Sequence, residues 1–93
     1  MTYLVLEIVR TRRGYAEVLA DILDVANQDL GVTKTTIVYK ANINFTNFET
    51  YFDFLECRDL IEKIHIDNGQ IRYGTTDKGK DFLKRYNYFK NLI

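Results

Sequence analysis

The sequence predicts an α+β domain that is mainly helical and carries a single β-hairpin. Three observations lead to this class. Apolar residues recur at helical spacing in residues 15–26 and again in residues 75–93, and two short runs rich in β-branched residues flank the pair Asn68-Gly69. With 46% hydrophobic and 28% charged residues in 93 positions, the chain has the composition and length of one globular domain, residues 1–93.

The charge of the chain is balanced. There are 13 Lys and Arg residues against 13 Asp and Glu residues, so the formal net charge at pH 7 is zero. Domains that bind nucleic acids usually carry an excess of basic residues. Only a local basic patch could therefore supply such binding here.

Cysteine content and the N-terminal residues bear on the location of the protein. Cys57 is the only cysteine, which excludes an intramolecular disulfide and is typical of a reducing, cytoplasmic setting. Residues 1–9 are apolar but too short to span a bilayer, and basic residues follow this run, whereas a secretory signal has them before it. We therefore expect neither export nor association with a membrane.

Residues 1–9 precede the first clear helix and form either an additional strand or a helical turn, because short apolar runs do not separate the two. From Tyr15 onward the spacing of apolar residues predicts a helix. Its inward-facing residues are Ala16, Leu19, Ala20, Ile22, Leu23 and Ala26. Gly31 suits a left-handed turn after this helix, and Val32 suits a very short strand.

A helix, a tight corner and a second helix are predicted next. Thr33 is a candidate cap for a helix over residues 34–40. The second helix is predicted to begin after Asn44, whose side chain can accept from a first-turn N–H, although Thr46 and Glu49 offer a competing capping box. With either start, the inward-facing side chains are Phe48, Tyr51 or Phe52, and Leu55.

The clearest local prediction is a β-hairpin over residues 60–73. The pair Asn68-Gly69 is favoured in two-residue type I′ turns. With these two residues as the loop, Ile66 faces Ile71, His65 faces Arg72 and Ile64 faces Tyr73. One face of the hairpin is then apolar and covers the core, whereas His65 and Arg72 share the outward face.

A last helix is predicted to begin with Thr75 or Thr76 as its cap and with Asp77 in its first turn. Its apolar stripe consists of Phe82, Leu83, Tyr86, Phe89, Leu92 and Ile93. This stripe is broader than one small domain needs, so we expect the helix to form the seam of a two-fold homodimer. The expected interface residues are Phe82, Tyr86, Phe89, Leu92 and Ile93.

This order of elements is that of a winged helix-turn-helix domain. Three segments also resemble the small archaeal winged-helix DNA-binding proteins, namely RTRRGYAEVLADIL, TKTTIVYKANINFTNFETYFDFL and TTDKGKDFLKRY. The resemblance runs from Arg10 onward and extends to chromatin-type members that dimerise through a C-terminal antiparallel coiled coil. It implies a positioning helix over residues 35–42, a recognition helix over residues 45–55 and a C-terminal dimerisation helix within residues 75–93.

The chain departs from this family at two places. The family tends to have lysines on the exposed surface of the recognition helix, where this chain has Thr46, Glu49 and Thr50. It also favours Gly before the first wing strand, where this chain has Asp59. The second departure costs little, because Asp adopts the left-handed conformation more readily than most residues.

Together these observations predict a homodimeric transcriptional regulator that binds double-stranded DNA, with the recognition helix in the major groove and the hairpin as the wing. The side chains expected at base edges are Asn44, Thr46, Asn47 and Thr50. Those expected at phosphates are Lys34, Lys40 and Arg72, followed by Arg12 and Arg13. The acidic helix surface and zero net charge also suit an alternative function, a winged-helix module that binds a protein rather than DNA.

No group of residues indicates catalysis. His65 is the only histidine, which gives neither a catalytic triad nor a set of metal ligands. The sequence also lacks a Gly-rich phosphate loop. We therefore expect no enzymatic activity, no cofactor, no metal ion and no small-molecule ligand.

Overall fold

The computed structural model describes residues 14–66 and 68–93. In chain order its elements are α2 (Tyr15–Ala26), α3 (Lys34–Lys40), α4 (Phe45–Cys57), β1 (Ile61–His65), β2 (Ile71–Thr75) and α5 (Asp77–Leu92). The predicted mainly helical α+β fold with a two-stranded wing is thus confirmed. The prediction for residues 1–9 and the two basic candidates Arg12 and Arg13 lie outside the described residues.

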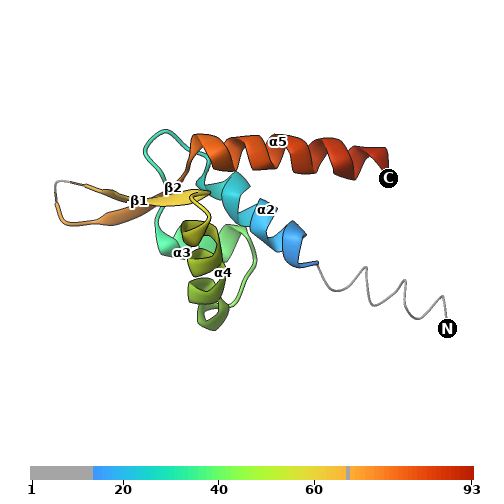
Figure 1. The fold of residues 1–93 in the computed structure, drawn as a ribbon. Helices are drawn as coiled ribbons and strands as arrows, with labels where there is room; N and C mark the ends of the chain where they lie inside the picture. The colour runs from blue at the N-terminus through green and yellow to red at the C-terminus, as the bar shows by residue number, and fades with distance from the viewer. Residues whose placement is uncertain (1–13, 67) are drawn as a thin grey trace.

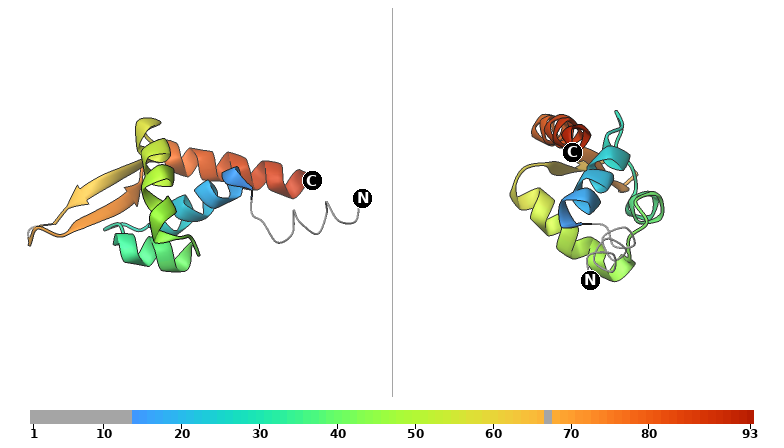
Figure 2. Two further views of the ribbon diagram at one scale, coloured as in Figure 1. Left: turned by 90° about the horizontal axis from the view of Figure 1, so that it is seen from below. Right: turned by 90° about the vertical axis from the view of Figure 1, so that its right-hand side faces the viewer.

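The hairpin and the last helix project from the helical body in opposite directions (Figure 1). Helix α2 lies at the centre of the body and contacts α3, β2 and α5. In the end-on view α5 runs along one side of α2, while α3 and α4 lie on the other side (Figure 2). None of the helices in the described part of the chain is long and apolar enough to cross a membrane.

The core is formed by the apolar faces of α2, α3 and α4, closed by the start of β1 and one side chain of α5. Its buried residues are Val18, Leu19, Ala20, Ile22, Leu23, Ala26, Ile37, Val38, Ala41, Phe48, Phe52, Leu55, Leu60, Ile61 and Leu83. Their helical spacing is the one that the sequence predicts for α2 and α4, because one face of each helix must leave water, but Ala16, expected to face inward, is exposed and Val18 is buried instead. The side opposite this core stays available for a partner.

The two helices of the helix-turn-helix begin at the predicted caps. The Thr33 hydroxyl accepts from the N–H of Thr36 (3.3 Å), and Asn44 Oδ1 accepts from the N–H of Thr46 (3.0 Å). Between them, Asn42 has φ of 55°, which turns the chain sharply out of α3. Of the two frames considered for α4, the Asn44 cap is therefore the one that forms.

Helix α4 is fixed against the wing by a group of aromatic rings. The rings of Phe48 and Phe52 are stacked on each other with centroids 5.7 Å apart. Tyr73 of β2 meets both rings edge to face, at 5.6 Å from Phe48 and 4.6 Å from Phe52. Phe52 is buried, whereas Tyr51 is half-buried beside Tyr15, so Phe52 is the core residue of the two alternatives.

The hairpin forms as predicted, but its predicted register is wrong by one residue. Ile64 pairs with Arg72, His65 with Ile71 and Lys63 with Tyr73. The N–H of Ile66 donates to the Gln70 carbonyl (2.9 Å) and that of Gly69 donates to the Ile66 carbonyl (2.8 Å), so the strands are joined across Ile66 and Gln70. Gly69 has φ of 83°, but Asn68 does not have a positive φ, and a type I′ turn needs a positive φ at both of its central residues, so the predicted type I′ turn does not form.

The register shift changes which side chains share a face, because side chains alternate along a strand. Tyr73 covers the core as predicted, but its partner across the sheet is Lys63. Ile71 is exposed and lies opposite the exposed His65, and Arg72 shares its face with Ile64. The predicted division of the hairpin into an apolar and a polar face is therefore wrong.

A third segment extends the sheet by one residue. Val32 pairs with Tyr73, the N–H of each donating to the carbonyl of the other at 2.9 and 2.7 Å, which confirms the predicted very short strand. The preceding Gly31 has φ of 69°, and a Cβ atom there would lie 2.8 Å from the Tyr73 carbonyl oxygen. Glycine is required at this position by both the backbone conformation and the close approach of β2.

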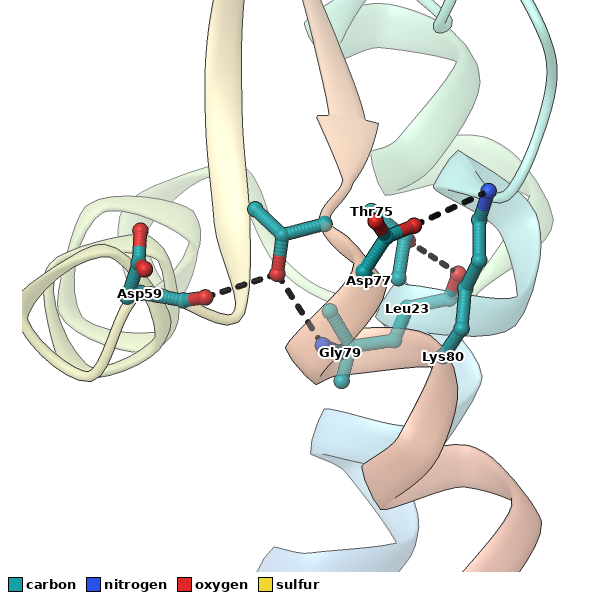
Figure 3. Close-up of polar contacts among 7 residues, drawn as sticks. Leu23, Asp59, Thr75, Asp77, Gly79 and Lys80 are labelled. Atoms are coloured by element: carbon teal, nitrogen blue, oxygen red, sulfur yellow. Dashed lines mark hydrogen bonds and ion pairs between the residues drawn. The ribbon is translucent and has the colours of Figure 1, made fainter.

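The joint between the wing and α5 depends on two adjacent threonines (Figure 3). The Thr76 hydroxyl accepts from the N–H of Gly79 (3.0 Å) and donates to the Asp59 carbonyl (2.7 Å), so Thr76 is the cap of α5. Thr75 is instead buried and donates to the Leu23 carbonyl. Asp59 has φ of 61°, the left-handed conformation expected of it.

Candidate nucleic-acid interface

The outer surface of α4 is polar, and its charge changes along the helix. Asn47 and Thr50 are exposed and uncharged, and they lie in the N-terminal half. Asp53 and Glu56 are exposed in the C-terminal half. In helix-turn-helix proteins the N-terminal residues of the second helix approach the bases, so the N-terminal half, where Glu49 is the one acidic residue, is the part suited to DNA.

Asn44 and Thr46 contact each other at the start of α4. Asn44 Oδ1 accepts from both the backbone N–H of Thr46 (3.0 Å) and the Thr46 hydroxyl (2.7 Å). A bidentate contact with adenine needs the asparagine carbonyl oxygen as an acceptor. Because both lone pairs of this oxygen are used in the cap, Asn47 is better placed than Asn44 for such a contact.

Lys34, a predicted phosphate contact, is engaged within the protein. Its ammonium lies 3.0 Å from Glu49 Oε1. The same Nζ lies 4.9 Å from the ring centroid of Phe48 and 5.7 Å from that of Phe45. The partner Glu49 lies fifteen positions further along the chain, so no local sequence pattern indicates the pair.

Arg72 is also held by contacts within the fold. It is half-buried, its Nε donates to Gln70 Oε1 and its Nη1 donates to the Gly31 carbonyl, both at 3.3 Å. The bond to Gly31 ties the wing to the loop before α3, whereas the bond to Gln70 lies within the hairpin. A contact of Arg72 with phosphate would have to use its remaining N–H groups.

Two further lysines, Lys40 and Lys63, are exposed on α3 and β1. Lys40 is exposed at the end of α3. Lys63, which we did not predict from the sequence, is exposed on β1 with its Nζ 5.6 Å from the ring centroid of Phe52 in α4. The predicted register paired Tyr73 with Ile64, and only the observed pairing of Tyr73 with Lys63 brings this lysine beside α4.

The stripe predicted for dimer formation divides into two parts on α5. Phe82 and Tyr86 are half-buried against the core, and their rings are stacked with centroids 6.2 Å apart. Beyond them Phe89, Leu92 and Ile93 are 59%, 66% and 91% exposed. Tyr88, which was not among the predicted interface residues, is 69% exposed on the same terminal turns. The apolar surface of the second part lacks a cover within the described chain.

The described residues contain no group of three or more His, Cys, Asp or Glu side chains that could hold a metal ion. The side chains of this surface on α3, α4 and the wing are hydrogen-bonding and charged groups. Such a surface serves recognition of a polar partner.

Residues 12–93 match the sequence model of a family described as winged helix-turn-helix. The fold is similar to that of Sso10a-2, a DNA-binding protein from Sulfolobus solfataricus, with a TM-score of 0.73 and 26% identity over 86% of this chain and 81% of that chain. No curated protein gives a significant match.

The fold is also shared with more distant proteins. A MepR mutant from S. aureus, bound to an oligodeoxyribonucleotide, superposes with a TM-score of 0.69 and 15% identity over 85% of this chain and 58% of its own. FabT from Streptococcus pneumoniae, in complex with DNA, superposes with a TM-score of 0.64 and 17% identity over 98% of this chain and 68% of its own. At these identities the likeness concerns the fold alone.

Proposed function

Because the chain belongs to the winged helix-turn-helix family, we propose that it binds double-stranded DNA sequence-specifically, as a homodimeric transcriptional regulator. The observation that carries this proposal is the outer surface of α4. Phe48 and Phe52 hold one side of the helix in the core, and this leaves Asn47 and Thr50 exposed on its N-terminal half. The likeness to Sso10a-2, a DNA-binding protein, supports the same function.

In the proposed complex α4 lies in the major groove and the hairpin approaches the neighbouring backbone. The side chains that face base edges are those of Asn47 and Thr50, together with Asn44 and Thr46, which are held by their mutual hydrogen bonds. Their hydroxyl and amide groups match the donors and acceptors of the bases. Lys40, Lys63 and Lys34 are the phosphate contacts from the described residues. Arg72 contributes through the bonds that orient the wing, and Arg12 and Arg13 remain second-rank candidates.

Homodimer formation would bring two copies of α4 to successive turns of the duplex. The exposed residues Phe89, Leu92 and Ile93 on α5 support this part of the proposal, together with the half-buried Phe82 and Tyr86. A second copy of the same stripe is a matching cover for an apolar helix surface at a two-fold axis.

Few basic residues are available, so the dependence of affinity on salt should be shallow. Each phosphate contact contributes roughly −0.9 to the slope of log affinity against log salt concentration, which gives about −3 to −5 for each protomer. An affinity that does not change with salt would exclude the phosphate contacts named above.

The proposal can be tested by gel retardation of fragments of the native genome at two salt concentrations. We expect Asn47→Asp to weaken specific binding about tenfold or more, because a bidentate base contact is worth about 1–3 kcal/mol. The substitution keeps the size of the side chain, and an acidic residue in the first turn of α4 is favourable for the helix. Loss of binding would therefore not reflect unfolding.

Asn87→Asp is the matched control, since Asn87 is exposed on α5 and the change in charge is the same. It should leave the affinity within about twofold of the parent, as expected for a distant charge screened by salt. Equal effects of the two substitutions would argue against α4 as the DNA-contacting helix. A parent chain that retards no genomic fragment would favour the alternative, a module that binds a protein.

A further inference from the structure

The contact between Lys34 and Glu49 joins the two helices of the helix-turn-helix at their exposed side. Lys34 is the first residue of α3, and its Nζ lies 3.0 Å from Glu49 Oε1 on α4. The two side chains are 36% and 63% exposed, so the pair borders on solvent rather than lying in the core. The rings of Phe45 and Phe48 lie within 6 Å of the same ammonium and limit its freedom further.

The position of Glu49 matters because of its neighbours. Asn47 and Thr50, the residues proposed to approach bases, flank it in sequence, and all three are exposed on the first turns of α4. A carboxylate at this place would lie close to the phosphates of a bound duplex. Phosphate and carboxylate repel each other, and both attract the Lys34 ammonium.

We infer that Glu49 competes with DNA phosphate for the ammonium of Lys34 and thereby lowers the affinity of the protein for DNA. This inference rests on the proposed function. If Lys34 turns to a phosphate, the Glu49 carboxylate is left without its partner beside a polyanion. If Lys34 stays with Glu49, the protein neutralises one phosphate fewer. Both outcomes weaken binding, and the second also makes the salt dependence shallower.

The inference predicts that removing one negative charge improves DNA binding. Glu49→Gln keeps the length of the side chain and frees the Lys34 ammonium. At low salt we expect an affinity about three- to tenfold higher, and a salt slope steeper by about 0.9 for the added phosphate contact. Fluorescence anisotropy with a labelled native fragment at four or more salt concentrations measures both quantities. Thermal unfolding of the variant should change little, because an exposed ion pair contributes little to stability.

Glu56→Gln is the matched control for net charge. Glu56 is exposed on the same helix and makes no ion pair with a residue of the described ranges 14–66 and 68–93. Its substitution should raise the affinity less than Glu49→Gln does and should leave the salt slope unchanged. An equal gain in both affinity and slope would show a general charge effect and would overturn the inference.

A double substitution isolates the part played by Lys34. In a Lys34→Met background, in which the alkyl chain can still cover the rings, Glu49→Gln should no longer steepen the salt slope. A slope that steepens equally in this background would overturn the inference, as would a lower or unchanged affinity of Glu49→Gln alone. These failures leave the proposed function in place as long as the parent chain binds DNA. A parent that binds no fragment overturns both.

Discussion

The Thr75 hydroxyl donates a hydrogen bond of 2.6 Å to the carbonyl oxygen of Leu23, a residue 52 positions earlier in the chain. Thr75 ends β2, and Leu23 lies in the last turn of α2, where carbonyl groups lack partners within the helix. Both residues are buried, so water cannot replace the bond without opening the core. This contact holds the wing to the central helix (Figure 3).

Replacing Thr75 by Val should destabilise the fold. The substitution keeps the shape of the side chain but leaves the buried Leu23 carbonyl without its donor, which costs about 1–3 kcal/mol. Urea denaturation followed by circular dichroism measures the change. Thr35→Val, at an exposed position of α3, should change the free energy of unfolding by less than about 0.5 kcal/mol. Similar values for the two variants would show that the buried bond is unimportant for stability.

Gly79, in the first turn of α5, lies against Leu60, the residue before β1. A Cβ atom at this position would meet the Leu60 carbonyl oxygen and lie 2.7 Å from Thr75 Cγ2. Gly79→Ala should therefore destabilise the protein by about 1–3 kcal/mol through forced displacement of backbone, although Ala favours helices. Gly14→Ala provides the comparison, because a Cβ atom there meets nothing within 4 Å. Gly14 is the N-cap of α2, and its replacement by Ala should lower the free energy of unfolding by only about a few tenths of a kcal/mol. A stabilising effect of Gly79→Ala would contradict the packing described.

Asp59 adopts a left-handed conformation with φ of 61° between α4 and β1. Glycine adopts this conformation without the steric cost of about 1 kcal/mol that other residues carry. Part of this stabilisation is offset, because glycine raises the conformational entropy of the unfolded chain. Asp59→Gly should therefore stabilise the protein by roughly 0.5 kcal/mol. The same exchange at Asp53, inside α4, should destabilise it by about 1 kcal/mol. The thermal unfolding temperature should rise for Asp59→Gly and fall for Asp53→Gly. A change in the same direction for both variants would contradict the strain at Asp59.

A substitution on the terminal turns of α5 tests the proposed dimer. Leu92→Glu places a charge on the apolar stripe and should convert the homodimer to a monomer in analytical ultracentrifugation, because an unpaired charge in an apolar interface is strongly unfavourable. Leu30→Glu makes the same exchange at a residue of equal type that is 71% exposed, against 66% for Leu92, and it should leave the dimer intact. A parent chain that sediments as a monomer at all concentrations would reject the dimer.

Much of the helix-turn-helix could be predicted from the sequence, because its signals are local. The Thr33 and Asn44 caps bond to residues two or three positions away, and the bounds of α3 follow from them. The left-handed conformation of Asp59 was expected from the glycine that the resembling family has at this position. The contacts of the binding surface, such as that of Lys34 with Glu49, join residues that are distant in the chain, so no local signal predicts them. The assignments of individual residues to bases, phosphates and the dimer seam remain predictions.

Local sequence signals predicted the hairpin but not its register. Asn68-Gly69 indicated a hairpin correctly, but Gly69 suits a two-residue loop or a longer one, and only the hydrogen bond from the Ile66 N–H to the Gln70 carbonyl decides between them. Tyr73 faces the core in either register, so the choice changes which side chains of β1 lie beside it, Lys63 instead of Ile64. A shift of one residue then reverses the face of every side chain on one strand.

The sequence by itself determined the order and approximate bounds of the helices in the described residues, the presence of the hairpin and the winged helix-turn-helix architecture, because helical periodicity, caps and turn residues act over a few positions. Only the tertiary structure decided the register of the wing, the burial of Thr75, the approach of Lys63 to α4 and the pairing of Lys34 with Glu49. Each of these depends on residues that are distant in the chain and meet only when the core has formed, since hydrogen bonds and ion pairs act over a few ångströms in space.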